Sequence, residues 1–206
     1  MTPAGVGTAV FLNCPFDDAY RPLLSAITFT VSDLGLIPRC ALEVDDAAEN
    51  RLDKIFRIVG ECRFGIHDVS RTDPDPSHGL PRFNMPLELG IFLGCRRFGG
   101  RRHAAKSCLV LDREPFRYQK FISDIAGQDI HSHRNDPREA VVAVRNWLRT
   151  ASGRAAIPGG AETWRRYTRF LAELPRICRR MRVSTAELVF ADYYGAVREW
   201  LDDNPS

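Results

Sequence analysis

The sequence predicts a doubly wound α/β fold: a mainly parallel five-stranded sheet with helices on both faces and a two-helix C-terminal extension. Short apolar segments alternate with amphipathic segments of helical length, which is typical of βαβ units. Polar, carboxylate-bearing residues directly follow several of the apolar segments. After a Pro/Gly break, two long helical segments follow. We therefore expect an α/β domain over residues 1–153 and a helical extension over 154–206, packed on it.

The five predicted strands are short apolar segments that end at a polar residue or a turn, as buried strands of a parallel sheet do. Pro38 lies within the second strand and has no N–H to donate to a neighbour, so we expect that strand to lie at an edge of the sheet or to start late. The predicted strands span Ala9–Asn13, Leu36–Leu42, Phe64–Val69, Cys108–Leu111 and Asp129–His131.

The predicted helices carry apolar residues at helical spacing and follow polar residues that suit N-caps. The expected caps are Asp17 or Asp18 for the first helix, Asp45 or Asp46 for the second, and Ser184 or Thr185 for the last. The first helix is expected to end near Leu34, and the others span Ala47–Cys62, Met85–Phe98, Phe116–Ile125, Pro137–Leu148, Glu162–Met181 and Thr185–Leu201. The segment Ser70–Arg82 is rich in proline and aspartate, and its length is typical of a functional loop.

The composition, 44% apolar and 27% charged, is that of a globular protein. A net charge of +3 is too small to indicate nucleic acid as a partner on its own. No apolar run approaches the roughly 20 residues of a membrane span, and the N-terminus has no signal-peptide pattern. We therefore expect a cytoplasmic protein without a membrane partner.

The six cysteines occur singly, with no CxxC pair, and the five histidines supply no zinc-binding spacing beside them. Buried free thiols are therefore expected, with no metal and no other bound cofactor. Walker A and GxGxxG motifs are also missing from the sequence. The cysteines are Cys14, Cys40, Cys62, Cys95, Cys108 and Cys178.

Function is expected at the carboxyl edge of the sheet, because ligands of open α/β sheets bind outside the carboxyl ends of the strands. Asn13 and Asp17 follow the first strand, and Asp68 ends the third. Glu88 begins the helix after the long loop. These four side chains are expected to meet at this edge.

Glu88 is the first candidate catalytic residue. Pro86 suits the first turn of a helix, which places Glu88 about three residues in, beside unpaired backbone N–H groups and the positive end of the helix dipole. These surroundings are expected to keep the carboxylate ionised, as a nucleophile or an oxocarbenium stabiliser requires. The alternative is a glutamate that only complements the helix dipole.

Asp68 is the second candidate catalytic residue. It could bind a ribose hydroxyl or act as a general acid or base beside Glu88, because two carboxylates in one pocket push their pKa values apart. The alternative is that Asp68 caps the following loop through Ser70 or neighbouring N–H groups.

The remaining candidate residues would bind the substrate. Asparagine and turn residues could contact a nucleotide, aromatic rings could stack on a base, and arginine could pair with phosphates. Cys14 could instead be a nucleophile, but no histidine is placed to activate it. These candidates are Asn13, Cys14, Phe16, Asp17, Arg82, Phe83 and Asn84.

The segment Glu162–Arg182 carries seven arginines. Such a basic face could bind an acidic partner or nucleic acid. The alternative is a solvated helix that packs through its apolar side chains.

The segments VFLNCPFDDAY (Val10–Tyr20) and MPLELGIFLG (Met85–Gly94), with the strand that ends in Asp68, resemble a known superfamily. It is the nucleoside 2-deoxyribosyltransferase-like superfamily, with its relatives, the TIR and TIR-like domains of bacterial immune systems. The resemblance covers about Ala9–Trp147. In both groups a helical glutamate acts at the anomeric carbon, and the resemblance assigns Glu88 to that role and Asp68 to an acidic position at the end of the third strand.

The resemblance implies cleavage or transfer at an N-glycosidic bond, with NAD or another nucleotide as the substrate rather than a cofactor. Phe11 stands where deoxyribosyltransferases often have a tyrosine, and Arg63 where they usually have an aspartate, which favours NAD or another ribonucleotide. A homo-oligomer and a role in antiphage defence are also implied. The open alternatives are a non-catalytic nucleotide-signal sensor, an adaptor, and a nucleoside 2-deoxyribosyltransferase.

Overall fold

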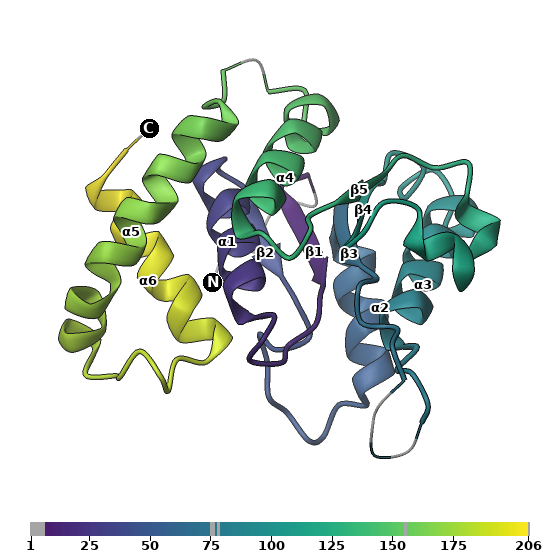
Figure 1. Ribbon diagram of the computed structural model, residues 1–206, viewed down its shortest axis with the longest axis horizontal. Helices are drawn as coiled ribbons and strands as arrows, with labels where there is room; N and C mark the ends of the chain where they lie inside the picture. The colour runs from purple at the N-terminus through teal and green to yellow at the C-terminus, as the bar shows by residue number, and fades with distance from the viewer. Residues whose placement is uncertain (1–6, 75–76, 78, 155, 206) are drawn as a thin grey trace.

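A parallel five-stranded sheet with the order β2-β1-β3-β4-β5 forms the centre of the molecule (Figure 1). The computed structural model describes residues 7–74, 77, 79–154 and 156–205. Its strands are β1 (Ala9–Asn13), β2 (Ile37–Arg39), β3 (Phe64–Asp68), β4 (Ser107–Asp112) and β5 (Ile130–Ser132). The predicted doubly wound α/β fold is therefore confirmed.

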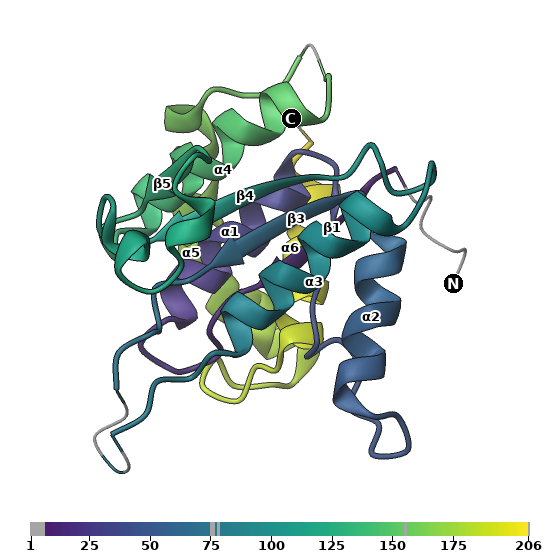
Figure 2. The same cartoon turned by 90° about the vertical axis from the view of Figure 1, so that its right-hand side faces the viewer.

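Helices lie on both faces of the sheet, α1 and α4 on one and α2 and α3 on the other, with α5 and α6 outside α1 (Figures 1 and 2). No helix among the described residues is long and apolar enough to cross a membrane. The helices are α1 (Arg21–Asp33), α2 (Arg51–Glu61), α3 (Asn84–Phe98), α4 (Pro137–Ala151), α5 (Gly160–Met181) and α6 (Phe190–Asp203), with the 3₁₀ helices η1 (Arg117–Lys120) and η2 (Ser123–Ile125).

Three helix starts differ from the prediction, and in two of them an expected cap bonds elsewhere. The Asp17 carboxylate accepts from the Tyr20 N–H in a turn before α1. Asp46 accepts from the Ala48 N–H, and Asn50 caps α2 instead. Helix α6 begins only at residue 190, after a turn that follows Ser184. The segment predicted as one helix from residue 116 forms η1 and η2.

Side chains alternate across the sheet and fill a core on each face. Leu12 and Ile66 pack in one cluster with Ile27 of α1. Phe11 packs in another with Phe92 of α3. This packing fixes the face of the sheet to which each strand side chain points, up to the carboxyl ends of the strands, where the polar residues begin.

The C-terminal helices share apolar contacts with the α/β domain. Phe29 of α1 lies between rings of both helices, with ring centroids 5.3 Å from Phe170 and 5.7 Å from Trp200. The buried Arg166 donates to Asp33 of α1 at 2.8 Å. The extension is therefore joined to α1 by packing and by a buried ion pair.

The two edges of the sheet are short. Strand β2 has three residues, and Pro38 lies in its middle, as the sequence predicted for an edge strand. Strand β5, at the other edge, also has three residues.

The predicted loop Ser70–Arg82 contains no helix among its described residues, and a single antiparallel bridge joins Pro74 to Pro81. Residues 75–76 and 78, with His78 among them, lie outside the described part, as does the N-terminal stretch 1–6.

Candidate active site

Alternation along β3 determines which helix layer each side chain at the carboxyl edge faces. Ile66 packs with residues of α1, whereas the His67 ring lies 4.9 Å from Phe92 of α3. Asp68 therefore faces the α1 side, and Asn13, which bonds to His67, faces the α3 side. Glu88 belongs to α3, on the other side of the sheet from Asp68, and a pocket shared by the two carboxylates stays a prediction.

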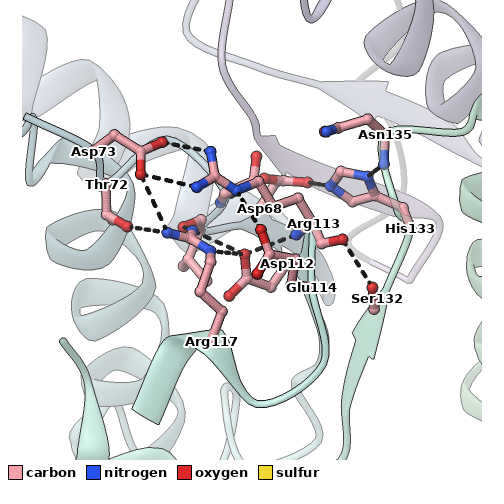
Figure 3. A network of polar contacts seen from close by, with 12 residues as sticks. Asp68, Thr72, Asp73, Asp112, Arg113, Glu114, Arg117, Ser132, His133 and Asn135 are labelled. Carbon is pink, nitrogen blue, oxygen red and sulfur yellow. Dashed lines mark hydrogen bonds and ion pairs between the residues drawn. The ribbon is translucent and has the colours of Figure 1, made fainter. Parts of the chain in front are cut away.

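Asp68 is fully buried and holds three segments together. Its carboxylate accepts from the Tyr20 hydroxyl at 2.7 Å and from the Ser70 N–H at 2.8 Å. His133 Nε2 lies 2.9 Å from the same carboxylate (Figure 3). Because His133 Nδ1 accepts from the Asn135 N–H, its ring proton is on Nε2, which faces Asp68. The capping bond to Ser70 is thus present, and catalysis by Asp68 stays a prediction.

Glu88 lies in the second turn of α3, because the helix begins at Asn84 rather than at Met85. Only 6% of its surface is exposed, and burial raises its pKa from 4.5 to about 7, while the charge of Arg51 lowers it. The prediction that the helix start keeps this carboxylate fully ionised is therefore wrong. Loss of hydration outweighs the dipole at this depth, and near neutral pH both protonation states are populated.

A cleft of about 560 Å³ lies at the same edge, and we call it the edge cleft. Asn84 and Met85, in the first turn of α3, line it. Glu88 lies one turn further along α3, at i+4 and i+3 from these residues, and so on the same helix face. The remaining lining residues come from the β1–α1 turn, the start of α2 and the long loop: Pro15, Phe16, Asp17, Arg51, Arg71, Asp73, Pro74 and Arg82.

Two cations of the edge cleft have no carboxylate partner among the described residues. Asp17 pairs with Arg71 at 2.9 Å, and Asp73 pairs with Arg113. Arg51 and Arg82 form no salt bridge with any residue that the structure describes, and both are exposed. Arginines without carboxylate partners are suited to bind phosphate oxygens.

The structure brings together four of the predicted substrate-binding residues, since Phe16, Asp17, Arg82 and Asn84 all line the edge cleft. Phe83 does not line it and is 57% exposed. Sequence reasoning missed Arg51, the first residue of α2. The available signal was the position of Arg51. It follows the loop after the second strand, and that loop lies at the carboxyl edge of the sheet.

Asn13 joins β1 to the start of α3. Its amide donates to the Met85 carbonyl at 2.8 Å and lies 3.0 Å from His67 Nδ1. Burial lowers the pKa of His67 to about 3, so the ring stays neutral and accepts from Asn13. Asn13 is 1% exposed and therefore fixes the helix turn before Glu88.

Cys14 is fully buried. Burial, with the charge of Asp68, raises the pKa of its thiol well above the ordinary value. A protonated, enclosed thiol is a poor nucleophile. A contact between Cys14 and substrate stays a prediction, since this residue does not line the edge cleft.

A second polar network supports the same edge from β4 (Figure 3). Asp112 is fully buried and accepts from Arg117 Nε at 2.9 Å. Arg117 also donates to the Val69 carbonyl and to Thr72 at the start of the long loop. Burial raises the pKa of Asp112, while Arg117 lowers it. This network holds the first residues of the long loop against the sheet.

The arginines of α5 are mostly paired with carboxylates. Arg165 pairs with Glu162, Arg166 with Asp33, Arg169 and Arg176 with Glu173, and Arg180 with Glu199. The pairing reduces the positive charge that α5 offers, which favours the solvated-helix alternative.

Within the described residues, no group of three or more His, Cys, Asp or Glu side chains could hold a metal ion. In comparisons with known proteins, no protein-family model and no curated protein sequence matches this chain.

Proposed function

We propose that this chain is a nucleotide N-glycosidase that cleaves NAD or a related nucleotide at its glycosidic bond, with Glu88 as the catalytic carboxylate. The observation that carries the proposal is the buried Glu88, with a pKa of about 7, on the α3 face that lines the edge cleft. A carboxylate with a raised pKa in or under a cleft is typical of a functional site.

The two cations of the edge cleft without a carboxylate partner among the described residues support a phosphorylated substrate rather than a nucleoside. Arg51 and Arg82 would bind phosphates, and Phe16 would stack on a base. Asn13 would act as a positioning residue through the Met85 carbonyl, and Asp68 through Tyr20 and His133.

In the proposed reaction, nicotinamide leaves C1′ with the electron pair of the glycosidic bond, and positive charge develops on the ribose. Ionised Glu88 stabilises this charge. Water then bonds to C1′ and loses a proton to the solvent, which gives ADP-ribose. A nucleophile within the same molecule would instead give a cyclic product. Because the ionised form is required, the rate is expected to rise as the pH passes through about 7.

The test compares nicotinamide release from NAD by the parent chain, Glu88→Gln and Glu139→Gln, over a range of protein concentrations that permits assembly. Glu139 is exposed on α4 and serves as the matched control. Glu88→Gln is expected to lose at least about a hundredfold in rate, and Glu139→Gln to match the parent. No release by the parent at any concentration, or equal rates for Glu88→Gln, would contradict the proposal.

A non-catalytic nucleotide sensor is the second candidate function. It is favoured by one observation: the arginines line the edge cleft, whereas Glu88 is only 6% exposed and does not line it. Thermal stabilisation by ADP-ribose without turnover of NAD would support the sensor.

The wider proposal follows the family resemblance: a cytoplasmic enzyme that acts as a homo-oligomer in antiphage defence. Size-exclusion chromatography with light scattering tests the oligomer. Protection of bacteria against phage by the parent, but not by Glu88→Gln, tests the role in defence.

A further inference from the structure

A larger cavity of about 880 Å³ lies between the start of α1, the loop from β2 to α2, and the C-terminal helices. We call it the junction pocket. Phe16 and Arg51 line both this pocket and the edge cleft, so the two hollows meet at these side chains. Cavities of 300–1,000 Å³ are the size class of small-molecule sites, and the two together suit a ligand longer than one nucleoside.

One wall of the junction pocket is aromatic and comes from the C-terminal helices. Tyr167 of α5 and Tyr193 of α6 line it, and both are buried. The Tyr193 hydroxyl donates to the Ser25 carbonyl of α1 at 2.9 Å. This bond and the packing of Phe29 hold the wall in place, so the pocket is preformed.

An unpaired hydroxyl belongs to a residue of α1 that also lines the pocket. Thr28 of α1 lines the pocket and is fully buried, yet its Oγ1 has no hydrogen-bond partner among the described residues. Two neighbours on the same helix behave differently, since Thr30 and Ser32 each donate to the carbonyl four residues earlier. A buried polar atom without a partner carries a cost, which a bound ligand that hydrogen-bonds to it would remove.

Basic side chains without a carboxylate partner among the described residues lie where the junction pocket meets the edge cleft. Asp18 pairs with Arg21, and Glu43 pairs with Arg39. Arg51 has no salt bridge to a described residue. The nearby Lys54 is 7% exposed and donates to the Val44 carbonyl at 2.6 Å. Asp45 also lines the pocket and has no salt bridge to a described residue, so Arg51 and Lys54 leave a net positive charge of one.

We propose that the junction pocket binds a nucleoside diphosphate, with its base against the tyrosine wall and Thr28 and its phosphates at Arg51 and Lys54. The inference rests on the proposed function: this moiety is the half of the substrate that is remote from the reacting bond. The C-terminal helices would then select dinucleotides over mononucleotides, because they build the wall that only the longer substrate reaches.

The test measures equilibrium binding of ADP to the parent chain and to three variants by calorimetry. Ala191→Trp fills the pocket from an exposed position that lines it, and Ala172→Trp places the same ring on an exposed part of α5 outside it. Thr28→Val removes the unpaired hydroxyl with little change of shape. ADP is expected to bind the parent and Ala172→Trp equally, Ala191→Trp at least about tenfold more weakly, and Thr28→Val about three- to tenfold more weakly.

Absence of ADP binding to the parent, or equal affinity for Ala191→Trp and Ala172→Trp, would overturn the inference. Because ADP has no bond to nicotinamide, this result is independent of turnover: a chain that binds ADP in the pocket but releases no nicotinamide contradicts the proposed function alone. Competition experiments distinguish whether the pocket binds the remote half of the substrate or a separate nucleoside diphosphate. ADP that inhibits NAD cleavage competitively, and leaves cleavage of nicotinamide mononucleotide unchanged, supports the remote half of the substrate, whereas purely non-competitive inhibition overturns that assignment.

Discussion

At the scale of single residues, one helical turn decides the chemistry of Glu88. A glutamate in the first turn would face unpaired N–H groups and remain ionised. The helix begins one residue earlier than predicted, so Glu88 falls in its second turn, where its exposure is 6% and desolvation raises its pKa to about 7. This pKa suits acid–base chemistry near neutral pH. Ionisation of the buried carboxyl group also lowers the stability of the fold.

Replacement of Glu88 by glutamine is expected to stabilise the protein at high pH. Because the pKa is raised from 4.5 to about 7, the folded state is penalised as Glu88 ionises. The penalty is absent below about pH 4.5, grows up to about pH 7 and is constant above, where it is at most about 3 kcal/mol. Thermal melts of Glu88→Gln and the parent should therefore differ most at pH 8 and converge towards pH 4.5. Equal melting temperatures at pH 8 would show that the carboxylate is hydrated.

The position of Asp68 shows what the sequence could and could not predict at this scale. Side chains alternate between the two faces of a strand, so Asp68 lies on the same face of β3 as Ile66. This much can be predicted from the sequence alone. It does not show which helix layer covers that face, because this depends on the direction of each crossover. The partners Tyr20 and His133 come from segments 48 residues before and 65 residues after Asp68, and no local pattern links them.

At the scale of elements, periodicity predicts helices well and their first residues poorly. The spacing predicts one apolar face of α2 with four residues, of which Ile55 and Val59 are buried, whereas Leu52 and Phe56 are 40% and 48% exposed. The start depends instead on which of several polar residues bonds to the first free N–H groups. The segment Asp45–Asn50 offers several such residues, and only Asn50 takes the position. Competing caps of similar strength cannot be ranked from sequence alone.

Removal of the observed cap of α2 is expected to cost more than removal of the predicted one. Asn50 accepts from the Leu52 N–H at 2.9 Å, so Asn50→Ala should lower the free energy of unfolding by about 1 kcal/mol. Asp45→Ala should change it by less than about 0.5 kcal/mol, because Asp45 is exposed and precedes the capping turn. Urea denaturation of both variants measures the difference. A larger loss of stability for Asp45→Ala than for Asn50→Ala would show that α2 begins earlier, near Ala47.

At the scale of the whole molecule, the α/β domain and its extension are joined through α1 and α4. One side of α1 packs on the sheet through Ile27, and another carries Phe29 into the aromatic cluster of α5 and α6. The fold class followed from the alternation of strands and helices. The contact between the halves depends on tertiary packing, which the composition of α5 did not reveal. The junction pocket exists only because of this contact, so it could not be predicted from motifs.

A chain cut after residue 153 is expected to lose its cooperative fold. The cut removes α5 and α6 and exposes Phe29, Ala26 and Val141, which are fully buried in the complete chain, together with Asp33. The loss of this cluster should exceed the few kcal/mol that usually separate a folded domain from its unfolded state. Circular dichroism melts of the full and shortened chains provide the measurement. A sharp melt of a soluble 1–153 fragment would show that the α/β domain is independent.

The short margins of the sheet bear on how copies of this chain can aggregate or assemble. Extended backbone with free N–H and C=O groups invites a neighbouring polypeptide to add as another strand. Here Pro38 removes a donor at one margin, and three residues at the other offer a template too small for stable pairing. Edge-to-edge stacking of native molecules is thereby disfavoured.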